Sequence, residues 1–171
     1  MLETVADIVG IVGGLSLLAG VIFAVIQIRQ LYEQRRDSAA IELMRAFQAP
    51  RFVEAFYKLG KVPAGLPARE LRAMGKEYEE AALTMVNIYE TVGLLVFRRT
   101  VSFEAVRQVC GGILASSWTQ LETWVGDVRD EQGSKRFGEW FQWLVERVRE
   151  QEAAAPTEPA QERYRTWRPR D

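Results

Sequence analysis

Asn87 and Glu90 are the strongest candidates for chemistry, because they are strongly polar side chains inside an apolar stretch of the chain. They lie three residues apart, so on a helix they share one face, which Leu83 and Leu94 bracket. A carboxylate in such surroundings must be paired, hydrogen-bonded or neutral. Two interpretations stay open. One is a ligand-binding or acid–base site; the other is a structural network in which Glu90 bonds to an arginine or an indole N–H of a neighbouring helix.

The chain offers little else for catalysis. It contains no His and one Cys, which excludes His-based triads, His-ligated metals and a disulfide within the chain. A single carboxylate without a second acid in register or a nucleophile is not an active site by itself. Cys110 lies on an apolar stripe, where a free thiol behaves as a small hydrophobe, and Ser116 and Ser117 have no base beside them. We therefore expect no catalytic residue, no metal and no cofactor, and the sequence favours a protein that is not an enzyme.

These residues must be positioned by a chain of 171 residues, of which 48% are hydrophobic, with a net charge of -1. This length allows one domain with a real core, together with a membrane segment and a tail. The balanced charge excludes a broadly basic nucleic-acid binder. The apolar residues are distributed unevenly, and their positions define the organisation of the chain.

Residues 8–28 contain no charged side chain. As a helix this stretch would be about 31 Å long, which matches a hydrocarbon core of about 30 Å. A cleaved signal peptide would have a basic start and a shorter apolar run, whereas Glu3 and Asp7 precede this one. A buried helix of a soluble protein is the other alternative. We predict a retained transmembrane helix over residues 8–28.

The charges that flank this helix predict its orientation. Acidic residues precede it, and Arg29, Arg35 and Arg36 follow it. The positive-inside rule therefore places residues 1–7 outside and the rest of the chain in the cytoplasm. A lone Cys agrees with a reducing compartment. We predict a single-pass protein of the inner (cytoplasmic) membrane with a cytoplasmic helical domain over residues 29–150.

Small residues line the predicted span at helical spacing. Such stripes let helix backbones approach each other closely in lipid, so we expect contact with a second copy or with another membrane protein. The alternative is that glycine is simply common in membrane helices. The stripe consists of Gly10, Gly13, Gly14, Ser16, Gly20 and Ala24.

The remaining pattern predicts an all-α fold, in which the N-terminal transmembrane helix continues into a small cytoplasmic helical bundle. We expect the first helix to end at Pro50, and a short helix over 52–59 to follow. The next helix covers 70–97, with a break near Gly75. Ser102 and Ser134 are predicted N-caps of the last two helices, and Gly133 is the predicted stop between them.

The helix over 70–97 is apolar most of the way round, which is typical of the centre of a bundle or of a membrane span. As a span it would bury Glu90 at a cost of at least about 2.5 kcal/mol and place Arg98 and Arg99 outside. We therefore expect it in the bundle. Four of the tryptophans fall within 26 residues, at Trp118, Trp124, Trp140 and Trp143. Most of these should lie in the core, and any exposed one would mark a contact with a partner or the bilayer.

Residues 151–171 are predicted to form a disordered tail, because the helical pattern dissolves into Ala, Pro and Glu after Glu150. The tail ends in basic residues interleaved with aromatic ones, which could contact anionic lipid headgroups. A solvated tail is the alternative, and the charge balance disfavours nucleic acid. The candidate lipid contacts are Arg163, Arg165, Trp167, Arg168 and Arg170.

The chain resembles a bacterial family of single-pass membrane proteins, domain-of-unknown-function family 4760, over roughly residues 8–148. The family has no assigned activity, so the resemblance implies the architecture and leaves the chemistry open. The tail after Glu150 lies outside it. The resemblance depends on short motifs, which are IQIR at 26–29, Arg35, Arg36, Ala39 and Ala40, NIYETVG at 87–93, and Trp118.

We therefore expect a membrane-anchored, non-enzymatic interaction or scaffold module, with the lipid bilayer and a second copy or another membrane protein as partners. The alternative is a membrane-tethered sensor or effector that binds a small ligand near Glu90, and the third candidate is an enzyme that acts on a lipid-phase substrate. A pocket that reaches Glu90 would favour the last two. A packed Glu90 bonded to its neighbours would favour the first.

Overall fold

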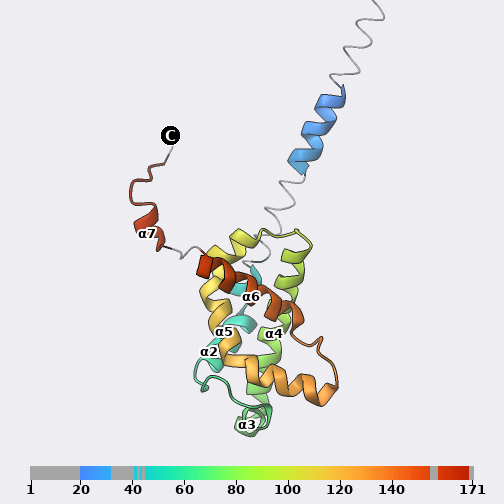
Figure 1. Ribbon diagram of the computed structural model, residues 1–171, viewed down its shortest axis with the longest axis vertical. Coiled ribbons are helices and arrows are strands. Elements are labelled where there is room, and N and C mark those ends of the chain that lie inside the picture. The colour runs from blue at the N-terminus through green and yellow to red at the C-terminus, as the bar shows by residue number, and fades with distance from the viewer. Residues whose placement is uncertain (1–19, 32–40, 42, 44, 155–157, 170–171) are drawn as a thin grey trace, which may run out of the picture.

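The computed structural model describes residues 20–31, 41, 43, 45–154 and 158–169 of the chain. Every regular element among these residues is a helix, which confirms the predicted all-α fold (Figure 1). After the helix Gly20–Leu31 come α2 (Pro50–Leu59), α3 (Ala68–Met74), α4 (Lys76–Phe97), α5 (Phe103–Gln132), α6 (Glu139–Ala154) and α7 (Ala160–Arg163).

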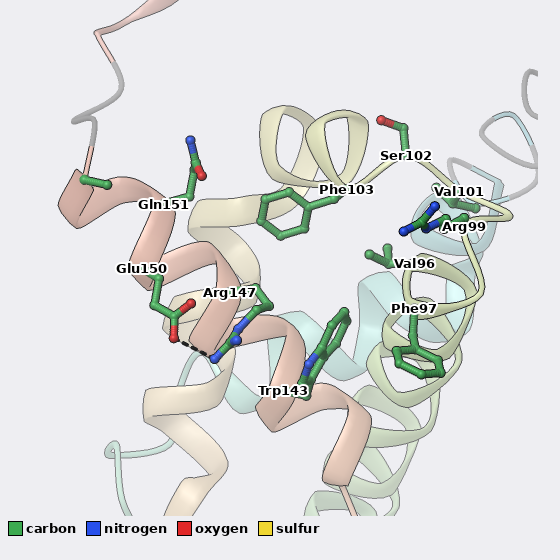
Figure 2. Close-up of a pocket in the computed structure, with 11 residues that line it drawn as sticks. Val96, Phe97, Arg99, Val101, Ser102, Phe103, Trp143, Arg147, Glu150 and Gln151 are labelled. Atoms are coloured by element: carbon green, nitrogen blue, oxygen red, sulfur yellow. Dashed lines mark hydrogen bonds and ion pairs between the residues drawn. The ribbon is translucent and has the colours of Figure 1, made fainter.

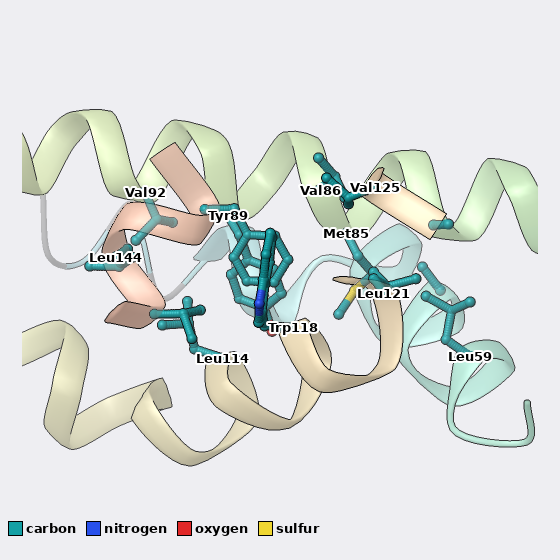
Figure 3. Packing of buried hydrophobic residues seen from close by; sticks show 14 of the residues in the cluster. Leu59, Met85, Val86, Tyr89, Val92, Leu114, Trp118, Leu121, Val125 and Leu144 are labelled. Atoms are coloured by element: carbon teal, nitrogen blue, oxygen red, sulfur yellow. The ribbon is translucent and has the colours of Figure 1, made fainter. Parts of the chain in front are cut away.

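Helix α4 is the centre of the bundle, because α2, α3, α5 and α6 all pack against it. Tyr89 of α4 is fully buried, and its ring lies between those of Phe52 in α2 and Phe141 in α6, at centroid distances of 6.0 and 4.6 Å. Figure 3 shows how α4 and α5 supply Tyr89 and Trp118 to the middle of this apolar cluster. The predicted central helix is confirmed.

Among the described residues, α4 is also the one helix that is long and apolar enough to cross a membrane by length and composition. The central helix of a bundle has the same properties, and in α4 the apolar side chains from Ala81 to Val96 that face the neighbouring helices are buried, whereas Leu83 and Phe97 are exposed. The first part of the predicted span, residues 8–19, lies outside the described residues. Residues 20–28 of that span belong to the helix Gly20–Leu31.

Several predicted boundaries are confirmed. Gly75, with a φ of 139°, separates α3 from α4. The Ser102 hydroxyl accepts a hydrogen bond from Ala105 N at the start of α5, and Gly133 ends α5 in the left-handed conformation. These signals are local, so a short stretch of sequence is enough to specify them.

Pro50 differs from the prediction, because it begins a helix instead of marking only the end of one. The preceding helical residues end at Gln48, and Pro50 is the first residue of α2. Proline suits this position, because a first-turn N–H has no partner within the helix. At the other end of the chain, α6 continues past Glu150 to Ala154, and Ala160–Arg163 form α7 within the predicted tail.

The chain enters the bundle at the end where α4 finishes. Helix α2 runs antiparallel to α4, since Phe52 packs on Tyr89 whereas Lys58 lies over the ring of Tyr78. Phe47, which precedes α2, also packs against Tyr89, at 5.9 Å. We call this the entry end, formed by residues 97–103 and 151–154; α3 and Gln132 form the far end. Figure 1 shows the helix Gly20–Leu31 beyond the entry end.

Gly93 allows α4 and α6 to approach each other closely. A Cβ atom at this position would lie 2.3 Å from the Trp140 carbonyl oxygen and 2.7 Å from its carbon. Both atoms belong to the backbone of α6, so no side-chain rotation could relieve the overlap. Any residue larger than glycine would therefore push α6 away from α4.

We predict that Gly93→Ala lowers the free energy of unfolding by at least about 2 kcal/mol, because the added methyl overlaps the backbone of Trp140. Thermal unfolding of the detergent-solubilised protein measures the change. Gly112→Ala is the matched control, since nothing lies within 4 Å of a Cβ there. It also sits inside a helix, where alanine should raise stability by up to about 1 kcal/mol. Equal effects of the two substitutions would contradict the close approach at Gly93.

Candidate functional site

Glu90 of α4 forms a polar contact with the start of α6. Its Oε2 accepts hydrogen bonds from the backbone N–H groups of Trp140 and Phe141, each at 3.0 Å. These residues lie in the first turn of α6, where N–H groups have no partner within their own helix. A side chain of α4 thus caps α6, although the two segments are 50 residues apart in the sequence.

The cap also has a favourable charge. The N-terminus of a helix carries roughly half a positive elementary charge, so a partly buried carboxylate there is compensated without a basic partner. Gly138, the residue before α6, has no side chain with which to cap it. The hydrogen-bond partners of the carboxylate are therefore backbone N–H groups of α6, where the sequence suggested an arginine or an indole N–H.

The predicted cap at Ser134 is wrong, because α6 begins five residues later, at Glu139. The Ser134 hydroxyl instead accepts from Arg136 N within the turn that follows α5. Arg129 holds this turn in place, with Nε donating to the Phe137 carbonyl at 2.7 Å and Nη1 donating to the side chain of Gln142 at 2.8 Å.

Asn87 does not join Glu90 in one site. Its side chain is exposed. Its backbone carbonyl oxygen accepts a hydrogen bond from the hydroxyl of Thr91, one turn later. Leu83, on the same face, is also exposed. Spacing alone places Asn87 and Glu90 on one helix face, but α6 covers only the part of that face that holds Glu90.

Tyr89, Ser117 and Cys110 have hydrogen-bond partners, whereas Trp124 Nε1 and Arg147 Nε are buried without one among the described residues. The hydroxyl groups of Tyr89 and Ser117 lie 3.2 Å apart, and burial raises the pKa of Tyr89 above its ordinary value. Cys110 donates to the Val106 carbonyl, and burial raises the pKa of its thiol to about 11. At neutral pH the Cys110 thiol is therefore protonated and a poor nucleophile.

Most of the predicted membrane-interface residues lie outside the described part of the chain. Gly10, Gly13, Gly14 and Ser16 lie there, as do Arg35 and Arg36. Gly20, Ala24 and Arg29 belong to the helix Gly20–Leu31, in which every residue is exposed. The predicted contacts of this segment with a second copy or another membrane protein therefore stay predictions.

The four tryptophans of the bundle divide into two pairs. Trp118 and Trp124 are buried. Trp140 and Trp143 are only partly buried, and they form an aromatic cluster with the exposed ring of Phe97, whose centroid lies 4.7 and 5.9 Å from theirs. Neither indole is exposed, so this pair does not meet the condition predicted for a contact surface; the exposed ring of the cluster is that of Phe97.

The basic residues of the tail are exposed where the structure describes them. Arg163 lies over the ring of Tyr164, at 5.6 Å, and Arg168 donates to the Trp167 carbonyl. Arg165 and Trp167 are exposed too, whereas Arg170 lies outside the described residues. The described tail therefore leaves its arginines available to a partner outside the bundle.

A groove of about 880 Å³ opens at the entry end, away from Glu90. Figure 2 shows Phe97 and Arg99 on one side of it and Trp143, Arg147 and Glu150 of α6 on the other. Arg147 Nη2 and Glu150 Oε1 form an ion pair at 2.6 Å. Within the described residues, no group of three His, Cys, Asp or Glu side chains is arranged to hold a metal ion.

The groove contains a residue whose importance the sequence pattern did not indicate. Arg99 has a φ of 57°, a conformation that usually belongs to glycine. Its N–H bonds to Val96 O, and Thr100 N bonds to Leu95 O, which closes α4 in the manner of a Schellman motif. The sequence signal that could have indicated it is the absence of glycine where the helix ends, at Arg98, Arg99 and Thr100.

Comparison with known proteins gives one match. The family model described as "Domain of unknown function (DUF4760)" matches residues 14–148, which cover the bundle through most of α6. No curated protein matches the chain, and no solved structure matches it either. The match includes Glu90, Gly93 and the groove residues up to Arg147, and it assigns no activity to any of them.

We predict that Glu90→Leu lowers the free energy of unfolding by about 2 kcal/mol, because two N–H groups of α6 lose their acceptor. Glu90→Gln keeps an acceptor and loses the charge, so it should cost less, about 0.5–1 kcal/mol. Glu122→Gln at an exposed position is the control, with a change within about 0.5 kcal/mol. Denaturant unfolding in detergent measures all three. A Glu90→Leu protein as stable as the parent would contradict the capping role.

Proposed function

The chain belongs to the DUF4760 family, a domain of unknown function, and we propose that it is a membrane-anchored helical module that acts through binding and not through catalysis. The observation that carries the proposal is the exposure of the helix Gly20–Leu31. Its large apolar side chains are between 48% and 61% exposed, and none is buried by the bundle. An apolar surface of this kind is typical of a segment that is covered by lipid or by a partner.

The polar interior supports an interaction module over an enzyme. The Glu90 carboxylate caps α6, and the Asn87 side chain is exposed to solvent. A ligand at Glu90, the alternative function, would have to displace two backbone N–H groups of α6. That displacement would uncover the first turn of the helix, so we favour the module without a ligand at this position.

The proposal includes an orientation. Arg29 and the two arginines at positions 35 and 36 follow the apolar segment, whereas acidic residues precede it. By the positive-inside rule the bundle lies in the cytoplasm and the short N-terminus lies outside. The protein is then a single-pass component of the inner membrane, with its partners in or beside that membrane.

We predict that the protein stays in the membrane fraction after alkaline carbonate washing and leaves it only in detergent, because the apolar segment spans the hydrocarbon core. A C-terminal fluorescent protein that folds in the cytoplasm should be active, and a C-terminal phosphatase that needs the periplasm should be inactive. Recovery of the protein in the soluble fraction would contradict the anchor. An active phosphatase fusion would contradict the orientation alone.

We also propose that the small-residue stripe of the anchor mediates self-association. Gly20 has open space around it, with nothing within 4 Å of a Cβ. Gly13→Leu with Gly20→Leu should weaken the oligomer in detergent, as measured by sedimentation, because the larger side chains separate the backbones. Ile22→Leu is the control, since position 22 lies on the opposite side of the helix from position 20. An unchanged oligomer in the double variant would exclude the stripe as the interface.

A further inference from the structure

Positive charge and an exposed aromatic ring lie together at the entry end, where Phe97 and Arg99 line the groove and Arg98 stands between them in the chain. Arg98 and Arg99 are both exposed, and neither side chain has a hydrogen-bond or ion-pair partner within the described part of the chain. Beside them the ring of Phe97 is 56% exposed. Aromatic and basic side chains together are typical of the headgroup region of a bilayer.

The conformation of Arg99 adds an independent argument. A non-glycine residue in the left-handed region is strained, and glycine would close the same helix end without that strain. The turn therefore holds a long basic side chain in a position where a smaller residue would make the fold more stable. Strain of this kind is concentrated at sites where the side chain has a role of its own.

The groove lies at the end of the bundle that is nearest the helix Gly20–Leu31. Leu43 is buried and Phe47 packs against Tyr89 just before α2 begins, and Figure 1 shows the helix Gly20–Leu31 beyond the entry end. If that helix is the anchor, the entry end is the part of the bundle nearest the bilayer. At the far end Arg72 is paired, with Glu79 and Glu131 at 2.6 and 2.7 Å.

We propose that the groove between the α4–α5 turn and α6 docks on anionic phospholipid headgroups of the cytoplasmic leaflet. Arg98 and Arg99 contact the phosphates, and Phe97 and Trp143 reach the interface beside them. The Arg147–Glu150 ion pair neutralises the only acidic side chain of the groove wall, so the net charge of the wall favours an anion. This inference rests on the proposed membrane anchor and adds a second, charge-dependent contact to it.

The test measures the depth of a spin label in the full chain, reconstituted in lipid nanodiscs. In a Cys110→Ala background, Thr100→Cys places the label in the exposed α4–α5 turn, and Gln132→Cys places the control label at the far end. The discs contain phosphatidylcholine alone or with about one third phosphatidylglycerol, by design. Collisions with oxygen, which partitions into lipid, and with a water-soluble nickel complex report the depth.

We expect the label at position 100 to lie at headgroup depth in the anionic discs and the label at position 132 to stay in water. Replacing Arg98 or Arg99 with Gln should lower the ratio of docked to undocked label about fivefold for each arginine. The docking would be overturned if, in anionic discs, the label at position 100 were as accessible to the nickel complex as the label at position 132. A label shielded from both reagents regardless of lipid charge would overturn it in favour of a protein partner.

The two proposals fail in different ways. A chain that does not enter the discs overturns the anchor, and the docking with it. A chain that enters the discs while position 100 stays in water overturns the docking alone. Carbonate extraction, which depends on the anchor, should be unchanged by Arg98→Gln and Arg99→Gln.

Arg99→Gly separates lipid contact from a structural role. Glycine relieves the left-handed strain, so the melting temperature should rise by about 2 °C, while the docked fraction of the position-100 label should fall as it does for Arg99→Gln. A variant that loses both stability and docking would overturn the assignment of Arg99 to lipid, because the side chain would then be needed for the fold. A variant that keeps full docking would overturn it as well.

Discussion

The contact between the Glu90 carboxylate and the first turn of α6 is the interaction on which the rest of the bundle depends. It fixes where α6 begins, and Gly93, one turn later, lets the two backbones meet. Once α6 is placed, Phe141 can stack on Tyr89 and meet the edge of Trp118, at 4.6 and 5.0 Å. The aromatic core therefore forms around a polar contact that no neighbouring residue of α6 could supply.

The same device recurs at other helix ends. Asp127 of α5 accepts from Ala68 N at the start of α3, at 2.7 Å. Gln120, also of α5, donates its side-chain amide to the carbonyls of Leu59, Val62 and Pro63 at the end of α2. Helix ends leave backbone groups that need partners, and in this bundle the two long helices provide many of them. Half-buried polar side chains of α4 and α5 thus bond to backbone groups at or near the ends of other helices.

The sequence predicts well whatever depends on local geometry. The breaks at Gly75 and Gly133 and the cap at Ser102 follow from residues within one turn of each other, and the central helix follows from its apolar periodicity. The cap at Ser134 fails because its real counterpart, Glu90, is far away in the sequence. Asn87 and Glu90 separate for the same reason, since the path of α6 decides which of them is covered.

The groove could not be predicted, because it exists only where the α4–α5 turn meets the last turns of α6. Its residues are unremarkable in sequence, and the positive φ of Arg99 is visible only in the folded chain. Because the Glu90 carboxylate is committed to capping α6, the charged groups left for contact with other molecules lie at the surface. At the entry end these are Arg98, Arg99 and the exposed ring of Phe97, and Arg99 has a backbone conformation that lowers stability. Such a sacrifice is expected where a side chain contributes to binding more than to folding.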